Sequence, residues 1–166
     1  MKKISVRSLS RAALIAAAYT VLSVATAPIS FGAVQARAAE ALTLLPVLMP
    51  EGVAGVAVGC LLTNMWGVAS GSNILGAADI VIGTAATLCA AVCTRRLRRH
   101  PLLAALPPVL FNAVAVGGEL MFAECGGVSA ALWLVNGAYI ALGQAFACYV
   151  LGLPLLHMLR RALRTA

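Results

Sequence analysis

The residues best suited to hold a small molecule are polar side chains that interrupt long apolar runs. They are Asp79, Glu119, Asn136 and Gln144. A carboxylate can accept two N–H groups together, and a side-chain amide can both donate and accept. Ionisable groups within apolar segments are costly and usually face a cavity or the interior of a bundle. This pattern predicts a binding site for a small polar molecule.

A second polar group is the motif Gln35-x-Arg37-x-x-Glu40. Arg37 and Glu40 are three positions apart, so on one helical turn they would face the same way. An arginine close to lipid is tolerated when its charge is paired. We interpret Arg37 as a structural clamp and place Glu40 or Gln35 nearer the ligand. Direct contact between Arg37 and a ligand is the alternative.

The composition places these residues in a membrane protein. Hydrophobic residues make up 62% of the 166 residues, and charged residues only 10%. Soluble domains have about 45–50% apolar and about 25% charged residues. The formal net charge of +7 does not indicate nucleic-acid binding, because the basic residues flank apolar runs and have no stacking aromatics among them. We therefore expect a single all-α integral membrane domain over residues 1–166.

The basic residues predict the topology. Eleven of the twelve Lys and Arg residues lie in the N-terminal tail, in the cluster Arg95–Arg99 or in the C-terminal tail, and the exception is Arg37. Basic residues in short loops mark the cytoplasmic side. A crossing helix needs about 20 apolar residues. These rules predict six transmembrane helices with both termini cytoplasmic, and Gln35–Glu40 on the outer side.

The expected crossings begin with residues 10–27 and end with residues 102–122 and 129–153. Three more lie between Arg37 and Arg95, with an inner turn around Pro50 and an outer turn from Gly67 to Gly76. The crossing from Glu40 to Pro50 is short, about 18 Å as an α-helix. It must be tilted, flanked by inserted loop, or buried among neighbours. We read the first apolar run as a retained helix, since it is longer than a signal peptide's apolar region and Pro28 would follow the cleavage site.

On this topology most polar residues collect at the outer ends of the helices. The candidate ligand-binding residues are Gln35, Glu40, Asn64, Asp79, Glu119, Trp133, Asn136, Tyr139 and Gln144. Trp66 and Trp133 are also compatible with aromatic anchors at the lipid interface. A cavity lined by carboxylates, amides and aromatics is typical of a small-molecule site.

Several other functions are not supported by motifs. The sequence has no phosphate-binding Gly-x-x-x-x-Gly-Lys-Ser/Thr loop and no His/Glu constellation of a membrane metalloprotease. The five cysteines are scattered through apolar segments, so we expect neither a metal nor a cofactor. We expect a binding subunit of a larger machine and not an enzyme.

Several segments resemble the QueT family. They are Ala27-Pro28-Ile29-Ser30-Phe31-Gly32, the stretch from Gln35 to Pro46, the stretch from Leu106 to Ala113, Gly117-Gly118-Glu119-Leu120, and the stretch from Cys148 to Leu155. The resemblance runs from Arg11 to about Met158. Members of this family are substrate-binding S components of energy-coupling factor (ECF) transporters for queuosine precursors. The family often has Glu after the glycine where this chain has Gly143-Gln144, so here an amide replaces a carboxylate.

The resemblance implies six helices in a bacterial cell membrane and a 7-deazaguanine ligand bound from outside. It implies as partners a transmembrane coupling subunit and two ATPase subunits. Glu119, Asp79 and Glu40 would then accept the ligand's N–H groups, and Trp133, Trp66 or Tyr139 would stack on its ring. The small residues of the first helix would dock the coupling subunit. They are Ala12, Ala13, Ala16 and Ala17.

Three alternatives stay open at this point. The ligand is another vitamin or nucleobase, or the chain is a stand-alone carrier whose buried carboxylates bind ions. The third alternative is a membrane enzyme with Asp79 and Glu119 as its acid–base pair. The sequence argues against that last reading, because no His lies near the outer residues and no nucleophile accompanies them.

Overall fold

A computed structural model of the chain describes residues 5–27 and 37–165, and every regular element in those ranges is helical. The elements are α1 (Val6–Ala25), η1 (Ala38–Val47), α3 (Glu51–Ala69), α4 (Ala77–Arg96), α5 (Pro101–Ala104), α6 (Leu106–Cys125), α7 (Ala130–Ala145), η2 (Phe146–Gly152) and α8 (Leu153–Thr165). The all-α prediction is confirmed for this part of the chain.

Five of the helical stretches are long and apolar enough to cross a membrane. They are Val6–Ala25, Glu51–Ala69, Ala77–Arg96, Pro101–Cys125 and Ala130–Leu163. Each corresponds to one of the six crossings expected from the sequence. The protein is therefore a multi-pass membrane protein.

The sixth expected crossing is the short element η1. It is a 3₁₀-helix of ten residues, with Pro46 inside it, and eight of those ten residues are buried. A 3₁₀-helix rises about 2.0 Å per residue, and runs longer than three or four residues are uncommon. Neighbouring elements therefore hold η1 in this form. Of the three arrangements considered for this segment, the structure shows burial among neighbours.

The first three helical elements alternate in direction, so α1 and α3 run parallel. Arg11 lies 3.8 Å from Glu51, and the backbone of Gly55 and that of Gly59 lie against Ile15 and Tyr19. A Cβ added to either glycine would come within 2.7 Å of the α1 side chain. The absence of a side chain at both positions lets the two helices approach this closely.

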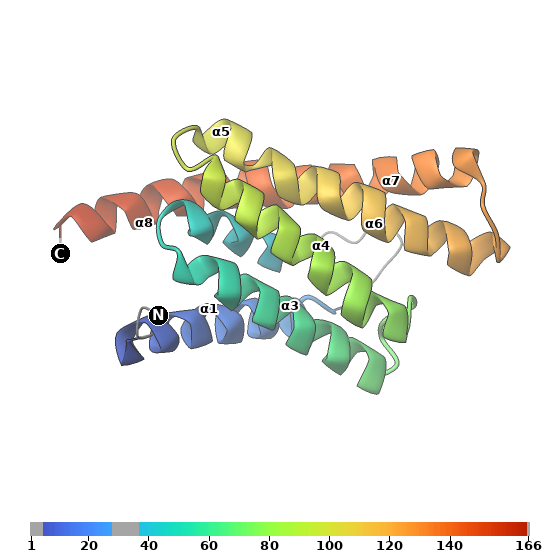
Figure 1. Ribbon diagram of the computed structural model, residues 1–166, viewed down its shortest axis with the longest axis horizontal. Helices are drawn as coiled ribbons and strands as arrows, with labels where there is room; N and C mark the ends of the chain where they lie inside the picture. The colour runs from blue at the N-terminus through green and yellow to red at the C-terminus, as the bar shows by residue number, and fades with distance from the viewer. Residues whose placement is uncertain (1–4, 28–36, 166) are drawn as a thin grey trace.

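The alternating directions give the molecule two chemically different ends (Figure 1). The start of α1, the turn between α4 and α5, and the end of α8 lie together at one end. That end carries the basic cluster Arg95–Arg99. The acidic residues Asp79, Glu119 and Glu124 belong to helix ends at the other side of the bundle. The six-crossing count and the cytoplasmic position of the termini stay predictions.

The last helix is longer than the expected residues 129–153. The elements α7, η2 and α8 follow one another without a break from Ala130 to Thr165, and η2 is π-helical. Ser129 caps the start of α7 by accepting a hydrogen bond from the Leu132 N–H. Single-turn π segments inside α-helices often mark functional sites. Here η2 is the part that packs along η1, where Gly152 lies against Leu44 and Ala41.

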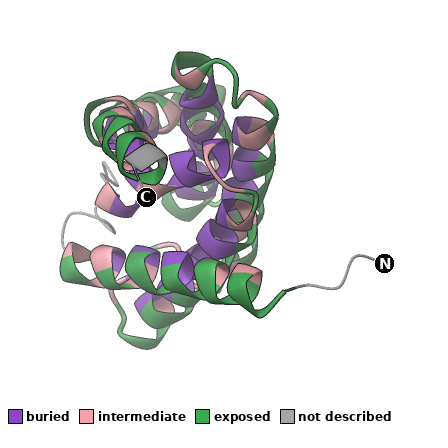
Figure 2. Cartoon of the chain, turned by 90° about the vertical axis from the view of Figure 1, so that its left-hand side faces the viewer, coloured by how far each residue is buried: buried purple, intermediate pink, exposed green. Residues whose placement is uncertain are grey.

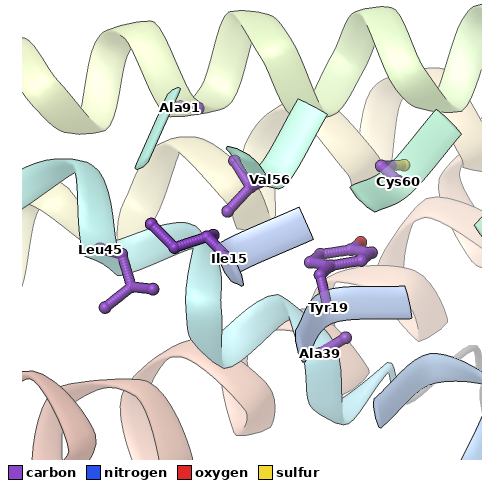
Figure 3. Packing of buried hydrophobic residues seen from close by; sticks show 7 residues of the cluster. All are labelled: Ile15, Tyr19, Ala39, Leu45, Val56, Cys60 and Ala91. Carbon is purple, nitrogen blue, oxygen red and sulfur yellow. The ribbon is translucent and has the colours of Figure 1, made fainter. Parts of the chain in front are cut away.

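The apolar core joins α1, η1, α3 and α4. Its largest cluster contains Ile15, Tyr19, Ala39, Leu45, Val56, Cys60 and Ala91 (Figure 3). The buried residues lie on the sides of the helices that face one another, and the exposed residues cover the outer faces (Figure 2). Those outer faces carry large apolar side chains such as Leu14, Val81 and Leu134, which is typical of a surface covered by lipid.

Candidate functional site

A buried ion pair ties the beginning of η1 to α4. The Arg37 guanidinium donates to Asp79 Oδ2 at 2.9 Å and to Asn64 Oδ1 at 3.3 Å. The amide of Asn64 in turn donates to the Asp79 carbonyl at 2.8 Å. All three residues are at most 3% exposed. Arg37 thus joins η1, α3 and α4 at the acidic end of the bundle.

The surroundings of Asp79 are shaped to hold its carboxylate. Asn73, in the loop before α4, donates to Asp79 Oδ2 at 2.9 Å, and its own Oδ1 accepts from the Leu75 N–H. Across one turn of α4, a Cβ added to Gly83 would collide with Asp79 Oδ1. Glycine at position 83 leaves the space that this oxygen occupies.

The expected placement of Arg37 and Glu40 on one helical turn is corrected by the backbone of Arg37. Arg37 is not inside a helical turn but precedes η1, with extended backbone angles of φ −77° and ψ 99°. The three-residue spacing rule applies only within a helix. The ion pair of Arg37 is formed with Asp79, which is 42 positions away.

Glu40 lies in the first turn of η1 and is 1% exposed. Tyr19 of α1 donates its hydroxyl hydrogen to Glu40 Oε1 at 2.5 Å. The second oxygen, Oε2, is buried and has no hydrogen-bond partner. One half of this carboxylate is therefore an unsatisfied acceptor inside the bundle.

Gln144 lies near the end of α7. Four residues further on, Cys148 lies 3.8 Å from both the Glu40 carbonyl oxygen and the Thr43 hydroxyl. Residues four apart share a helix face, so Gln144 lies on the side of α7 that faces η1. It is 2% exposed, and its amide oxygen has no hydrogen-bond partner.

Glu119 contributes the third carboxylate, from α6. Both of its oxygens are buried without a hydrogen-bond partner, and its charge is close enough to interact with those of Asp79 and Arg37. It also lines a pocket of about 540 Å³ between α4 and α6. The other lining residues are Leu75, Ala78, Ile82, Ala115, Gly118, Phe122 and Ala123. Glu119 is thus the charged group of an otherwise apolar pocket of the size that small ligands occupy.

The charges of this region do not balance. Three carboxyl groups, those of Glu40, Asp79 and Glu119, accompany the guanidinium of Arg37. The unpartnered buried atoms of the three carboxyl groups and of Gln144 are all acceptors. A buried acceptor without a partner is costly. The site is therefore complementary to a molecule that brings several N–H donors or a positive charge.

Comparison with known proteins identifies the family of this chain. The family model described as QueT transporter matches residues 9–161. The chain belongs to the QueT transporter family. No curated protein and no solved structure matches it significantly. The resemblance read from the sequence is confirmed, and QueT membership makes the chain a membrane transport protein.

The remaining residues proposed as ligand contacts in this QueT chain lie apart from the cluster. Trp133 is 42% exposed and donates to the Val114 carbonyl at 3.0 Å, in a shallow groove between α6 and α7. Tyr139 is 52% exposed. Asn136 is mostly buried and donates to Glu124 at 3.1 Å. The structure does not bring these three side chains to Arg37, and Gln35 lies outside the described residues.

Sequence reasoning missed three residues of the site. Tyr19 holds Glu40, Asn73 holds Asp79, and Phe122 supplies an aromatic ring to the pocket of Glu119. Tyr19 is the only tyrosine in the apolar sequence of α1, and this could have been recognised from the sequence. The structure shows that it is completely buried. Nothing in the sequence pattern distinguishes Phe122 from a residue in contact with lipid.

The four alanines expected to dock the coupling subunit lie on different faces of α1. Ala16 is 5% exposed, and its carbonyl would lie 3.0 Å from a Cβ added to Gly59. The Ala12 carbonyl would lie 2.9 Å from a Cβ added to Gly55. Ala12 and Ala16 therefore pack against α3, whereas Ala13 and Ala17 are exposed.

Proposed function

We propose that this chain is the S component of an ECF importer and that it binds a 7-deazaguanine queuosine precursor at the Glu40–Glu119 end of the bundle. The observation that carries the proposal is the set of buried, unpartnered acceptors on Glu40, Glu119 and Gln144. These atoms lie on η1, α6 and α7, so one ligand would join three elements.

The chemistry of a deazaguanine fits this set. Its ring N–H and exocyclic amino group point the same way, and one carboxylate can accept from both. The unpartnered amide oxygen of Gln144 would accept a further N–H group of the ligand. An aminomethyl substituent would be cationic and would use the second carboxylate. In this assignment Glu119 and Glu40 contact the ligand, while Asp79 is occupied by Arg37 and Asn73.

The proposed partners follow from the same family assignment. Ala13 and Ala17 form the exposed small-residue face of α1, where a coupling subunit could approach closely. Two ATPase subunits would drive the cycle from the cytoplasmic side. The basic end of the bundle would lie on that side, and the Glu40–Glu119 end would face outward.

Glu119→Gln tests the ligand site in purified protein. Losing a charge-assisted hydrogen bond costs about 1.5–3 kcal/mol, which corresponds to roughly 10- to 150-fold in Kd. Titration with a 7-deazaguanine is expected to show this loss. Glu51→Gln is the matched control, because Glu51 pairs with Arg11 at the opposite end. An unchanged Kd in Glu119→Gln would place the ligand elsewhere.

A stand-alone carrier is the second candidate, favoured by the same unpartnered carboxylates of Glu40 and Glu119. Such buried groups serve as proton sites in many carriers. Uptake by cells that express the chain with and without an ECF module separates the two functions. Accumulation without the module, collapsing when the proton gradient is removed, would support the carrier.

A further inference from the structure

The strongest unassigned feature is a basic pocket at the end of the molecule opposite the ligand site. Arg95, Arg96, Arg98 and Arg99 line a hollow of about 480 Å³ where α4 ends and the chain turns into α5. Arg95 is fixed, because its guanidinium donates to the carbonyls of Pro46 at 2.9 Å and Val47 at 3.3 Å. The other three arginines are exposed.

No carboxylate of the described residues neutralises this pocket. The ion pairs found in that part of the chain are Arg11–Glu51 and Arg37–Asp79. The topology rule accounts for positive charge at this end but not for four arginines around one hollow. Guanidinium groups bind phosphate oxygens in a bidentate manner, so the pocket is complementary to a phosphate.

An apolar groove begins at the same turn. Leu97, which lies between Arg96 and Arg98 in sequence, lines a hollow of about 330 Å³ together with Cys93, Leu103, Leu106, Pro107, Leu110 and Phe111. A further hollow of about 360 Å³ shares Leu110 and Phe111 and extends to Val114 and Ala115. From Leu106 to Ala115 the α6 helix rises about 14 Å. The groove therefore runs from the arginines along the outer surface of α4 and α6.

We propose that this surface is a binding site for an anionic phospholipid, with the phosphate in the arginine pocket and one acyl chain in the groove. A free phosphate would use the arginines alone, whereas a lipid uses both parts. Basic pockets between membrane helices on the cytoplasmic side bind anionic lipid head groups in other proteins. The site is separate from the ligand site and does not depend on the proposed substrate.

Native mass spectrometry of the delipidated protein in detergent tests the proposal. The probes are phosphatidylglycerol and phosphatidylcholine with identical acyl chains, and glycerol phosphate as the head group alone. We expect the unaltered chain to retain phosphatidylglycerol over phosphatidylcholine. The triple variant Arg96→Gln/Arg98→Gln/Arg99→Gln should lose roughly a hundredfold in affinity, at about fivefold for each arginine.

Three matched variants separate the explanations. Arg7→Gln/Arg160→Gln/Arg161→Gln removes the same charge outside the pocket and should leave phosphatidylglycerol binding nearly unchanged. The variant Arg96→Lys/Arg98→Lys/Arg99→Lys keeps the charge and the topology, and should retain part of the affinity. Leu110→Trp should weaken lipid binding by filling the groove.

Two results would overturn the proposal. Equal loss in the pocket variant and its charge-matched control would show diffuse attraction only. Glycerol phosphate displacing the lipid at equal concentration, with Leu110→Trp without effect, would show an anion site that does not hold a lipid.

Discussion

At the scale of single residues, the acidic side chains of the site divide into two kinds. Asp79 is paired with the Arg37 guanidinium, and Arg37 and Asn73 both donate to its Oδ2, whereas its Oδ1 has no hydrogen-bond partner. Glu40 is held on one oxygen by Tyr19 and is unpartnered on the other, and Glu119 is unpartnered on both. Carboxyl groups thus have two kinds of surroundings here. Asp79 is ion-paired with Arg37, whereas Glu40 and Glu119 form no ion pair among the described residues.

We predict that Asp79→Asn destabilises the protein more than it alters ligand chemistry. Removing one partner of a buried ion pair leaves an uncompensated charge and costs about 3–5 kcal/mol. Thermal unfolding in detergent should show this loss, and Arg37→Met/Asp79→Leu should recover much of it. Full stability of Asp79→Asn with selectively weakened ligand binding would instead assign Asp79 to the ligand.

The sequence predicted Glu40, Asp79, Glu119 and Gln144 because each is polar within an apolar run. It did not predict the partners of these residues. The pairing of Arg37 with Asp79 depends on how α4 meets the beginning of η1, which periodicity does not encode. The misreading of Arg37 and Glu40 had a physical cause, since the spacing was read as one α-turn and Arg37 lies before the helix in extended backbone.

At the scale of elements, α1 presents two small-residue faces with different surroundings. The Ala12–Ala16 face packs against Gly55 and Gly59 of α3, and the Ala13 and Ala17 positions are exposed. The sequence predicted the existence of α1, α3, α4 and α6 from apolar length alone. It could not assign the faces, because alanine occurs on both.

Ala13→Trp and Ala16→Trp should therefore behave differently. Ala13→Trp is expected to abolish ATPase-dependent uptake while ligand binding by the isolated subunit stays intact, because the bulky ring holds a partner helix away. Ala16→Trp should reduce yield and ligand binding together, by overpacking the α1–α3 contact. Normal uptake by an Ala13→Trp variant that inserts at normal levels would mean that this face contacts lipid.

At the scale of the whole molecule, the two ends differ in charge. Four of the five acidic residues belong to the end with the ligand site, and Glu51 pairs with Arg11 at the other. The cluster Arg95–Arg99 lies at the end where α1 begins and α8 finishes (Figure 1). A basic end of this kind is expected in the cytoplasm.

Cysteine accessibility in intact cells measures this orientation. In a background with the five native cysteines replaced, Ser70→Cys should react with an impermeant thiol reagent added outside. His100→Cys, at the α4–α5 turn, should react only after the membrane is opened. The reverse pattern would invert the topology and move the ligand site to the cytoplasm.

The shortness of η1 also has a consequence for biosynthesis. Ten residues that include Glu40 are too few to stop in a bilayer on their own, where about 20 apolar residues are needed. Among the elements that bury η1 is η2, which the ribosome makes near the end of the chain. We infer that η1 becomes buried in its final position only after the ribosome has synthesised the chain as far as Gly152. A nascent chain arrested before Phe146 should leave a cysteine introduced at Thr43 open to a soluble thiol reagent, and the full chain should protect it. Protection at the shorter length would show that η1 is inserted without its late-made neighbour.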